Sequence, residues 1–149
     1  MEEEENRFLK YRKSDITIIR SLQESVMNEA AYGMLFRMGQ LMGSRIAKAA
    51  RPFKQQYFEA ARRLLVDEGW AKDIQFQNDV ITVSGSIEVE KGRDSTCHML
   101  RGVIAKIYEG YFGKIMYCAE QECDSGEAGK GRCLFKVQYA NPADKAKKA

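Results

Sequence analysis

The apolar residues of this chain first recur every three or four positions, as in helices, and later alternate with polar residues, as in strands. This change in spacing limits the folds that the chain can adopt. Over residues 16–46 apolar side chains recur every three or four positions, which predicts one long helix or two helices broken near Tyr32-Gly33. A second amphipathic helix is predicted over 53–67. The apolar positions of the first segment are Ile19, Leu22, Val26, Ala30, Met34, Met38, Leu41 and Met42.

Methionine and glycine give the first segment two further properties. Its methionines could fill a core or form an adaptable wall around an apolar ligand. Gly39 and Gly43 lie four residues apart, so on a helix they share one face and would let another backbone approach closely.

After residue 70 the pattern becomes that of strands. Residues 80–90 alternate between apolar and polar side chains, as a strand with one buried face does. A shorter and weaker strand is predicted over 72–76, and Asn78-Asp79 is the expected tight turn between the two. The apolar positions predicted to face inward on the longer strand are Ile81, Val83, Ile87 and Val89.

One more helix and two more strands complete the pattern. The helix is predicted to begin at Asp94 or Ser95 and to end at Gly113. Strands are expected over 114–121 and 132–139. The predicted class is therefore α+β, with N-terminal helices packed on an antiparallel sheet and the order ααββαββ.

The chain has the length and composition of one soluble domain. Its 149 residues are 44% hydrophobic and 30% charged. We predict a charged tail over 1–13, a single domain over 14–140 and a basic tail over 141–149. The acidic first residues and the absence of a long apolar run favour a cytoplasmic protein without a membrane span. A net charge of only +3, with dispersed basic residues, argues against nucleic-acid binding.

All four cysteines lie in the last third of the chain, at Cys97, Cys118, Cys123 and Cys133. In a cytoplasmic protein such clusters are more often metal ligands or redox groups than disulfides. Cys97 falls in the first turn of a predicted helix, where the helix dipole favours a thiolate. A loop that leaves at Cys123 and returns at Cys133 would bring two sulfurs together, as in a zinc knuckle. The spacing also fits small buried apolar side chains that bind no metal.

The region from about Ile81 to Tyr139 resembles the 4-vinyl reductase domain family. The resemblance lies in Val83-Ser-Gly-Ser-Ile-Glu-Val, Cys97-His-Met-Leu-Arg-Gly-Val-Ile-Ala, Ala119-Glu-Gln-Glu-Cys-Asp-Ser-Gly and Arg132-Cys-Leu-Phe-Lys-Val. The family contains stand-alone archaeal proteins, a protein of bacteriochlorophyll synthesis, and the sensory domain of phenol- and toluene-responsive transcription activators.

The resemblance implies a metal site. Its sensory members hold zinc with three cysteines and a glutamate, and the matching residues here are Cys97, Glu120, Cys123 and Cys133. Cys118 or Glu122 could replace one of them. His98, the only histidine, is a weaker candidate, because neighbouring helical residues point about 100° apart.

A zinc ion with three thiolates and a carboxylate has a filled shell and a net charge of about −2, which favours a structural role over a catalytic one. The basic residues expected to offset this charge are Arg101, Lys130 and Arg132.

The resemblance further implies a binding domain for a hydrophobic or aromatic small molecule, acting as a sensor or carrier. It also implies a homodimer. We predict no catalytic residues, because the sequence has no Gly-rich dinucleotide fingerprint, no proton-relay cluster and no second redox motif. Two alternatives stay open: an accessory protein or enzyme of tetrapyrrole vinyl-group reduction, and a dimeric interaction module without a ligand. The residues that could line a ligand pocket are Met34, Phe36, Met38, Tyr57, Phe58, Trp70, Phe76, Tyr108, Tyr111 and Phe112.

Overall fold

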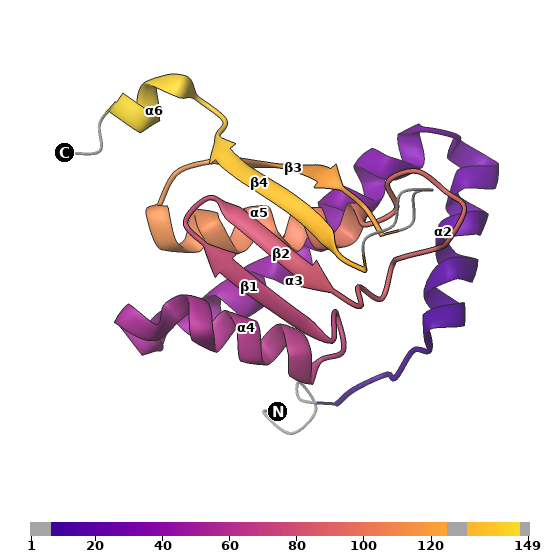
Figure 1. Cartoon of the computed structure of the whole chain (residues 1–149), viewed down its shortest axis with the longest axis horizontal. Helices are drawn as coiled ribbons and strands as arrows, with labels where there is room; N and C mark the ends of the chain where they lie inside the picture. The colour runs from indigo at the N-terminus through magenta and orange to yellow at the C-terminus, as the bar shows by residue number, and fades with distance from the viewer. Residues whose placement is uncertain (1–6, 125–130, 147–149) are drawn as a thin grey trace.

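A computed structural model describes residues 7–124 and 131–146 of the chain. Helices precede and interrupt a four-stranded antiparallel sheet with strand order β1-β2-β4-β3 (Figure 1). The elements are α2 (Lys13–Met27), α3 (Ala30–Ala50), the 3-10 helix η1 (Arg51–Gln56), α4 (Tyr57–Asp67), β1 (Asp73–Gln77), β2 (Val80–Ser84), α5 (His98–Phe112), β3 (Met116–Glu122), β4 (Cys133–Tyr139) and α6 (Pro142–Ala146). The predicted α+β class and element order are confirmed, with the first helical segment divided in two.

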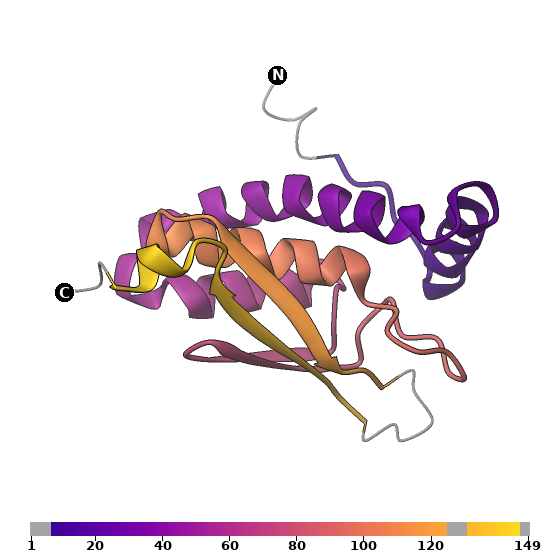
Figure 2. The ribbon, with the colours of Figure 1, turned by 90° about the horizontal axis from the view of Figure 1, so that it is seen from above.

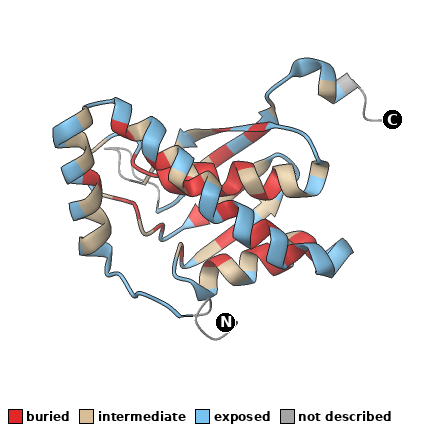
Figure 3. Cartoon of the chain, turned by 180° about the vertical axis from the view of Figure 1, so that it is seen from behind, coloured by how far each residue is buried: buried red, intermediate tan, exposed pale blue. Residues whose placement is uncertain are grey.

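The helices lie in layers on one face of the sheet. Helices α4 and α5 lie against the sheet, and α3 packs on the other side of α5 (Figure 2). Buried residues gather where these three helices and the sheet meet, whereas α2 is mostly exposed or half-buried (Figure 3). None of the helices within 7–124 and 131–146 is long and apolar enough to cross a bilayer.

Glycines allow α3 and α5 to pack closely. A Cβ atom at Gly39 would lie 1.9 Å from the carbonyl oxygen of Met99, and one at Gly43 would lie 2.8 Å from that of Val103. On α5, a Cβ atom at Gly102 would lie 2.1 Å from the carbonyl oxygen of Phe36. The predicted close approach at Gly39 and Gly43 is confirmed, and the approaching backbone is that of α5.

The helix break and the buried face of the N-terminal segment differ from the prediction. The break falls at Asn28, whose φ of 52° a right-handed helix cannot continue, and not at Tyr32-Gly33. Apolar residues predicted to be inward are exposed: Leu22, Val26, Met34, Leu41 and Met42. The core face of α3 consists instead of Ala31, Leu35, Gly39, Gly43, Ile46, Ala47 and Ala50. Small residues form this face because α5 lies so close.

The predicted strand over 80–90 ends at Ser84. Gly85, with a φ of 65°, turns the chain out of the strand. Beyond it the predicted alternation does not hold, because the polar side chains of Ser86 and Glu88 are buried and Ile87 is only half-buried. Val89 is buried, as predicted. Residues 85–97 therefore form an irregular segment that leads to α5.

Candidate metal centre

The start of α5, the end of β3 and the start of β4 meet at one end of the sheet and bring three cysteines and a glutamate together. Cys97 is the N-cap residue of α5, and Glu120 lies near the end of β3. A register irregularity between Glu120 and Glu122 ends the regular pairing of β3 with β4. Cys123 follows β3, and Cys133 is the first residue of β4. The structure thus places all four residues that the resemblance implied in one cluster, which we call the Cys3Glu centre.

The spacing of the ligand atoms in the Cys3Glu centre suits a tetrahedral ion. The Sγ atoms of Cys97 and Cys133 are 3.7 Å apart, and those of Cys133 and Cys123 are 3.9 Å apart. One ligand atom from each residue, Glu120 included, lies within 4.8 Å of all the others. A tetrahedral zinc shell with Zn–S bonds of about 2.3 Å has sulfur–sulfur separations of about 3.8 Å. The donor set can therefore take zinc without rearrangement of the backbone.

The carboxylate of Glu120 has no hydrogen bond of its own in the described part of the chain. Both of its oxygens are buried, and the side chains of Ser95, Cys97 and Cys123 lie beside them. Burial, together with the neighbouring Cys123, raises the pKa of Glu120 to about 8. Because burial disfavours the negative charge of this carboxylate, binding of a cation beside it would be favourable.

The thiols of the centre also resist ionisation in the absence of a cation. Hydrogen bonds with Cys123 and Cys133, together with burial, raise the pKa of Cys97 well above its usual value. The hydrogen bond with Cys123 is the main cause that raises the pKa of Cys133 to about 12. Packing several acidic groups into one buried cluster is unfavourable unless a positive ion compensates for their charge.

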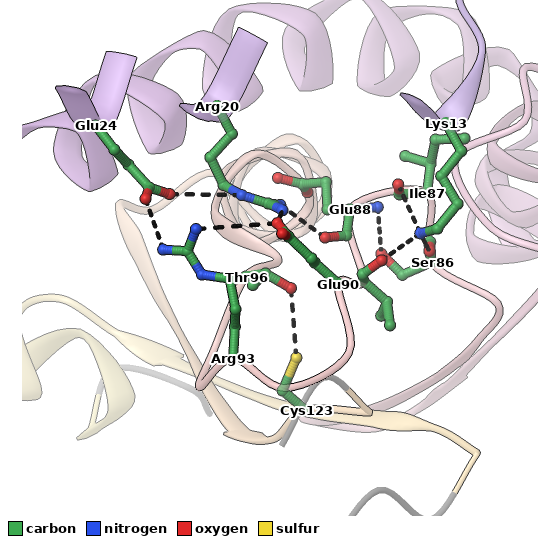
Figure 4. A network of polar contacts seen from close by, with 11 residues as sticks. Lys13, Arg20, Glu24, Ser86, Ile87, Glu88, Glu90, Arg93, Thr96 and Cys123 are labelled. Atoms are coloured by element: carbon green, nitrogen blue, oxygen red, sulfur yellow. Dashed lines mark hydrogen bonds and ion pairs between the residues drawn. The ribbon is translucent and has the colours of Figure 1, made fainter. Parts of the chain in front are cut away.

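Three further groups approach the sulfurs as hydrogen-bonding partners. The hydroxyl of Ser86 lies 3.2 Å from the Cys97 sulfur. The hydroxyl of Thr96 lies 3.8 Å from the Cys123 sulfur (Figure 4). The backbone N–H of Asp124 donates to the Cys133 sulfur over 3.4 Å. Donors of this kind orient thiolate ligands and reduce their charge. These partners are not predictable from the local pattern, because Ser86 lies in a segment that alternates like a strand.

The alternative ligands lie outside the Cys3Glu centre. Cys118 is completely buried on β3, and burial raises its pKa. Glu122 faces Arg132, with 3.8 Å between Oε2 and Nε. The ring of His98 stacks on that of Tyr32 at 4.2 Å, and burial lowers the pKa of His98 to about 4.

The three basic residues predicted to offset the charge of the centre lie in different places. Arg132 is next to Cys133 and faces the Glu122 carboxylate, whereas Arg101 lies over the ring of Phe36, 4.6 Å from its centroid. Lys130 lies outside the described residues. Lys91, which was not predicted, pairs with the Asp124 carboxylate at 2.8 Å, one residue after Cys123.

The aromatic residues predicted to line a ligand pocket pack mainly against one another. Phe58 is at the middle of this aromatic cluster, and its ring centroid lies 4.9–5.3 Å from those of four neighbours. Those neighbours are Tyr57, Phe76, Tyr108 and Tyr111. Phe58 and Phe76 also line a surface cleft of about 310 Å³ between α4 and β1. Met34, by contrast, is 44% exposed on α3 and lies outside the cluster.

Comparison of the chain with family models and with curated proteins finds no match. Solved structures do match. The phenol-responsive sensory domain of the transcription activator PoxR, solved with phenol, superposes with a TM-score of 0.72 at 18% identity, over 94% of this chain and 81% of that one. A vinyl-4-reductase family protein from Methanocaldococcus jannaschii gives a TM-score of 0.58 at 16% identity, over 90% of this chain and 98% of that one. The chain therefore has the fold of these two proteins, in agreement with the resemblance seen in the sequence.

Proposed function

We propose that the chain is a zinc-containing binding domain for a small hydrophobic or aromatic molecule, acts as a sensor or carrier, and belongs to the 4-vinyl reductase domain family. The observation that carries this proposal is the Cys3Glu centre, on a fold shared with a phenol-responsive sensory domain. The thiols must stay reduced to bind zinc, which agrees with the predicted cytoplasmic location.

Zinc in this centre would be held by Cys97, Glu120, Cys123 and Cys133. When bound, it would supply the positive charge that the buried thiols and carboxylate lack. Four protein ligands leave no position for a reactive water, so we assign the ion a structural role. It would join the start of α5 to the ends of β3 and β4.

The ligand site is proposed at the aromatic cluster around Phe58, which the cleft between α4 and β1 reaches. Aromatic rings that contact one another at tilted angles can separate around a flat apolar guest at a modest cost in packing. Phenol is bound by the similar sensory domain, and it is the natural first probe.

A homodimer is part of the same proposal. Ile18, Leu22 and Val26 follow one another at four-residue intervals on α2, and each is 63–74% exposed. Such a stripe suits a second copy of the same helix. The alternative, a role in tetrapyrrole vinyl-group reduction, is favoured by one observation, the shared fold with a vinyl-4-reductase family protein.

Native mass spectrometry of freshly purified protein, combined with metal analysis, tests the proposal. We expect one zinc per chain, a dimer, and an apolar compound that is released on mild denaturation or replaced by added phenol. A co-purified pigment with visible absorbance would favour the tetrapyrrole alternative. Metal-free protein that stays folded in chelator would overturn the zinc assignment.

Zinc binding at pH 7 is expected to release at least three protons per chain. The pKa values of Cys97, Glu120 and Cys133 all lie above 7 in the metal-free protein, so these groups carry protons that zinc must displace. Affinity should therefore fall as the pH is lowered. Titration calorimetry in two buffers of different ionisation enthalpy measures the release, and equal heats in both buffers would contradict it.

A further inference from the structure

Helix α2 is attached to the rest of the domain by polar contacts more than by apolar packing. Its buried residue is Arg20, which is only 2% exposed. No residue of α2 belongs to the buried apolar core of the described chain. A short helix held in this way depends on its polar partners for its position.

The polar partners of α2 lie in the irregular segment 85–97. Lys13, at the start of α2, donates its ammonium hydrogens to three carbonyl oxygens of this segment (Figure 4). They belong to Ser86 at 3.4 Å, Ile87 at 3.1 Å and Val89. Because Lys13 binds backbone carbonyl oxygens, its contact with segment 85–97 depends on the backbone conformation of that segment.

Arg20 makes the second attachment, about two turns further along the same face of α2. Its Nη1 donates to the carbonyl oxygen of Glu88 over 2.8 Å, and its Nη2 pairs with the Glu90 carboxylate (Figure 4). A third pair joins Glu24 of α2 to Arg93 at 2.6 Å. Because Arg20 is buried, its charge is poorly solvated if these acceptors move away.

The opposite side of segment 85–97 contacts the Cys3Glu centre. Ser86 approaches the sulfur of Cys97, and Thr96 approaches that of Cys123. The Glu88 carboxylate accepts hydrogen bonds from the backbone N–H groups of Met99 at 2.9 Å and Leu100 at 2.7 Å. These bonds tie the segment to the first turn of α5, directly after Cys97.

We propose that segment 85–97 couples the occupancy of the Cys3Glu centre to the docking of α2. The proposal rests on zinc binding by that centre. A bound ion fixes the Cys97 and Cys123 sulfurs, and through Ser86 and Thr96 it fixes the segment whose carbonyls hold Lys13 and Arg20. Loss of the ion frees the segment, and α2 then loses the geometry of its attachment. The position of the exposed apolar residues of α2, Ile18, Leu22 and Val26, therefore depends on whether the ion is bound.

Coupling of this kind is reciprocal. The factor by which zinc suppresses opening of α2 must equal the factor by which docked α2 strengthens zinc binding. If α2 lay beside the centre without being coupled to it, undocking of α2 would not change the affinity for zinc.

Hydrogen exchange of the full-length protein, with zinc and after chelation, tests the coupling. We expect chelation to speed the exchange of α2 amides about tenfold or more, with little change in α4, which lies away from the centre. In Arg20→Met, α2 should exchange rapidly even with zinc bound, and zinc affinity should fall by a similar factor. Lys13→Met provides a second variant, with a smaller effect, if Arg20→Met does not fold.

Lys91→Met is the matched control. Lys91 lies in the same segment and pairs with Asp124 beside the centre, but its contacts are on the side of the centre and not with α2. Lys91→Met should leave the exchange of α2 amides unchanged, because the coupling runs through Lys13 and Arg20. Zinc bound at one per chain with α2 exchange unaffected by chelation would overturn the coupling and leave the proposed function intact. Absence of zinc binding would overturn both.

Discussion

Cys123→Ser is expected to reduce bound zinc from one per chain to almost none. A serine hydroxyl does not ionise near neutral pH and is a poor ligand for zinc, so the remaining residues supply only three good donors. Zinc at a thousand times its dissociation constant stabilises a folded chain by about 4 kcal/mol, and the variant should lose a similar free energy of unfolding. Metal analysis and urea unfolding with and without chelator measure the two effects.

Cys118→Ala is the control for this substitution. Cys118 is also a completely buried cysteine of the same sheet, but its sulfur lies outside the Cys3Glu centre. We expect it to retain zinc and to lose only about 1 kcal/mol from the lost packing. If Cys118→Ala loses the metal and Cys123→Ser keeps it, Cys118 is the ligand and our assignment is wrong.

Gly102→Ala is expected to be among the most damaging single substitutions in the chain. The new Cβ would lie 2.1 Å from the carbonyl oxygen of Phe36 and 2.9 Å from the backbone nitrogen of Gln40. Both are backbone atoms of α3, so the contact is relieved only if the two helices separate. We expect a loss of about 4 kcal/mol or more in the free energy of unfolding, measured by urea denaturation.

Gly33→Ala, in the same helix α3, is expected to stabilise the protein and serves as the control for Gly102→Ala. Gly33 lies in α3, and a Cβ atom there would meet nothing within 4 Å. Because alanine favours the helix, this variant should gain about 0.5–1 kcal/mol. Equal effects of the two substitutions would contradict the close packing of α3 on α5.

Helices and strands were predictable where the apolar residues follow a clear helical or strand periodicity. The strands at 72–76 and 132–139 and the end of the helix at Gly113 are found within one or two residues of their predicted positions. That helix begins later than predicted, at His98 and not at Asp94 or Ser95. The buried face of α3 was not predictable from apolar residues alone. Large side chains such as Met34 and Leu41 repeat at helical spacing but point outward, because α5 approaches over glycine and alanine.

The four members of the Cys3Glu centre were predictable from the sequence, whereas the groups that surround the centre were not. Cysteine spacing indicated a cluster, and the family resemblance selected Glu120 as the fourth member. The partners of the cluster depend on a change in backbone direction at Gly85, after which Ser86 and Glu88 turn inward. Strict alternation through that glycine predicts the opposite orientation. The contacts of Lys13 and Arg20 join residues more than sixty positions apart, and a local pattern carries no information about them.

The packing of α3 against α5 has a consequence for how the protein is made. Helix α3 ends at Ala50, whereas α5 begins only at His98, so a ribosome completes the first helix long before its main partner exists. The nascent chain must carry the small-residue face of α3 uncovered during that interval, and contacts between distant segments form slowly. Cys133 emerges later still. Because Cys133 begins β4, which pairs with both β2 and β3, the proposed zinc centre can be completed only when the sheet itself is completed.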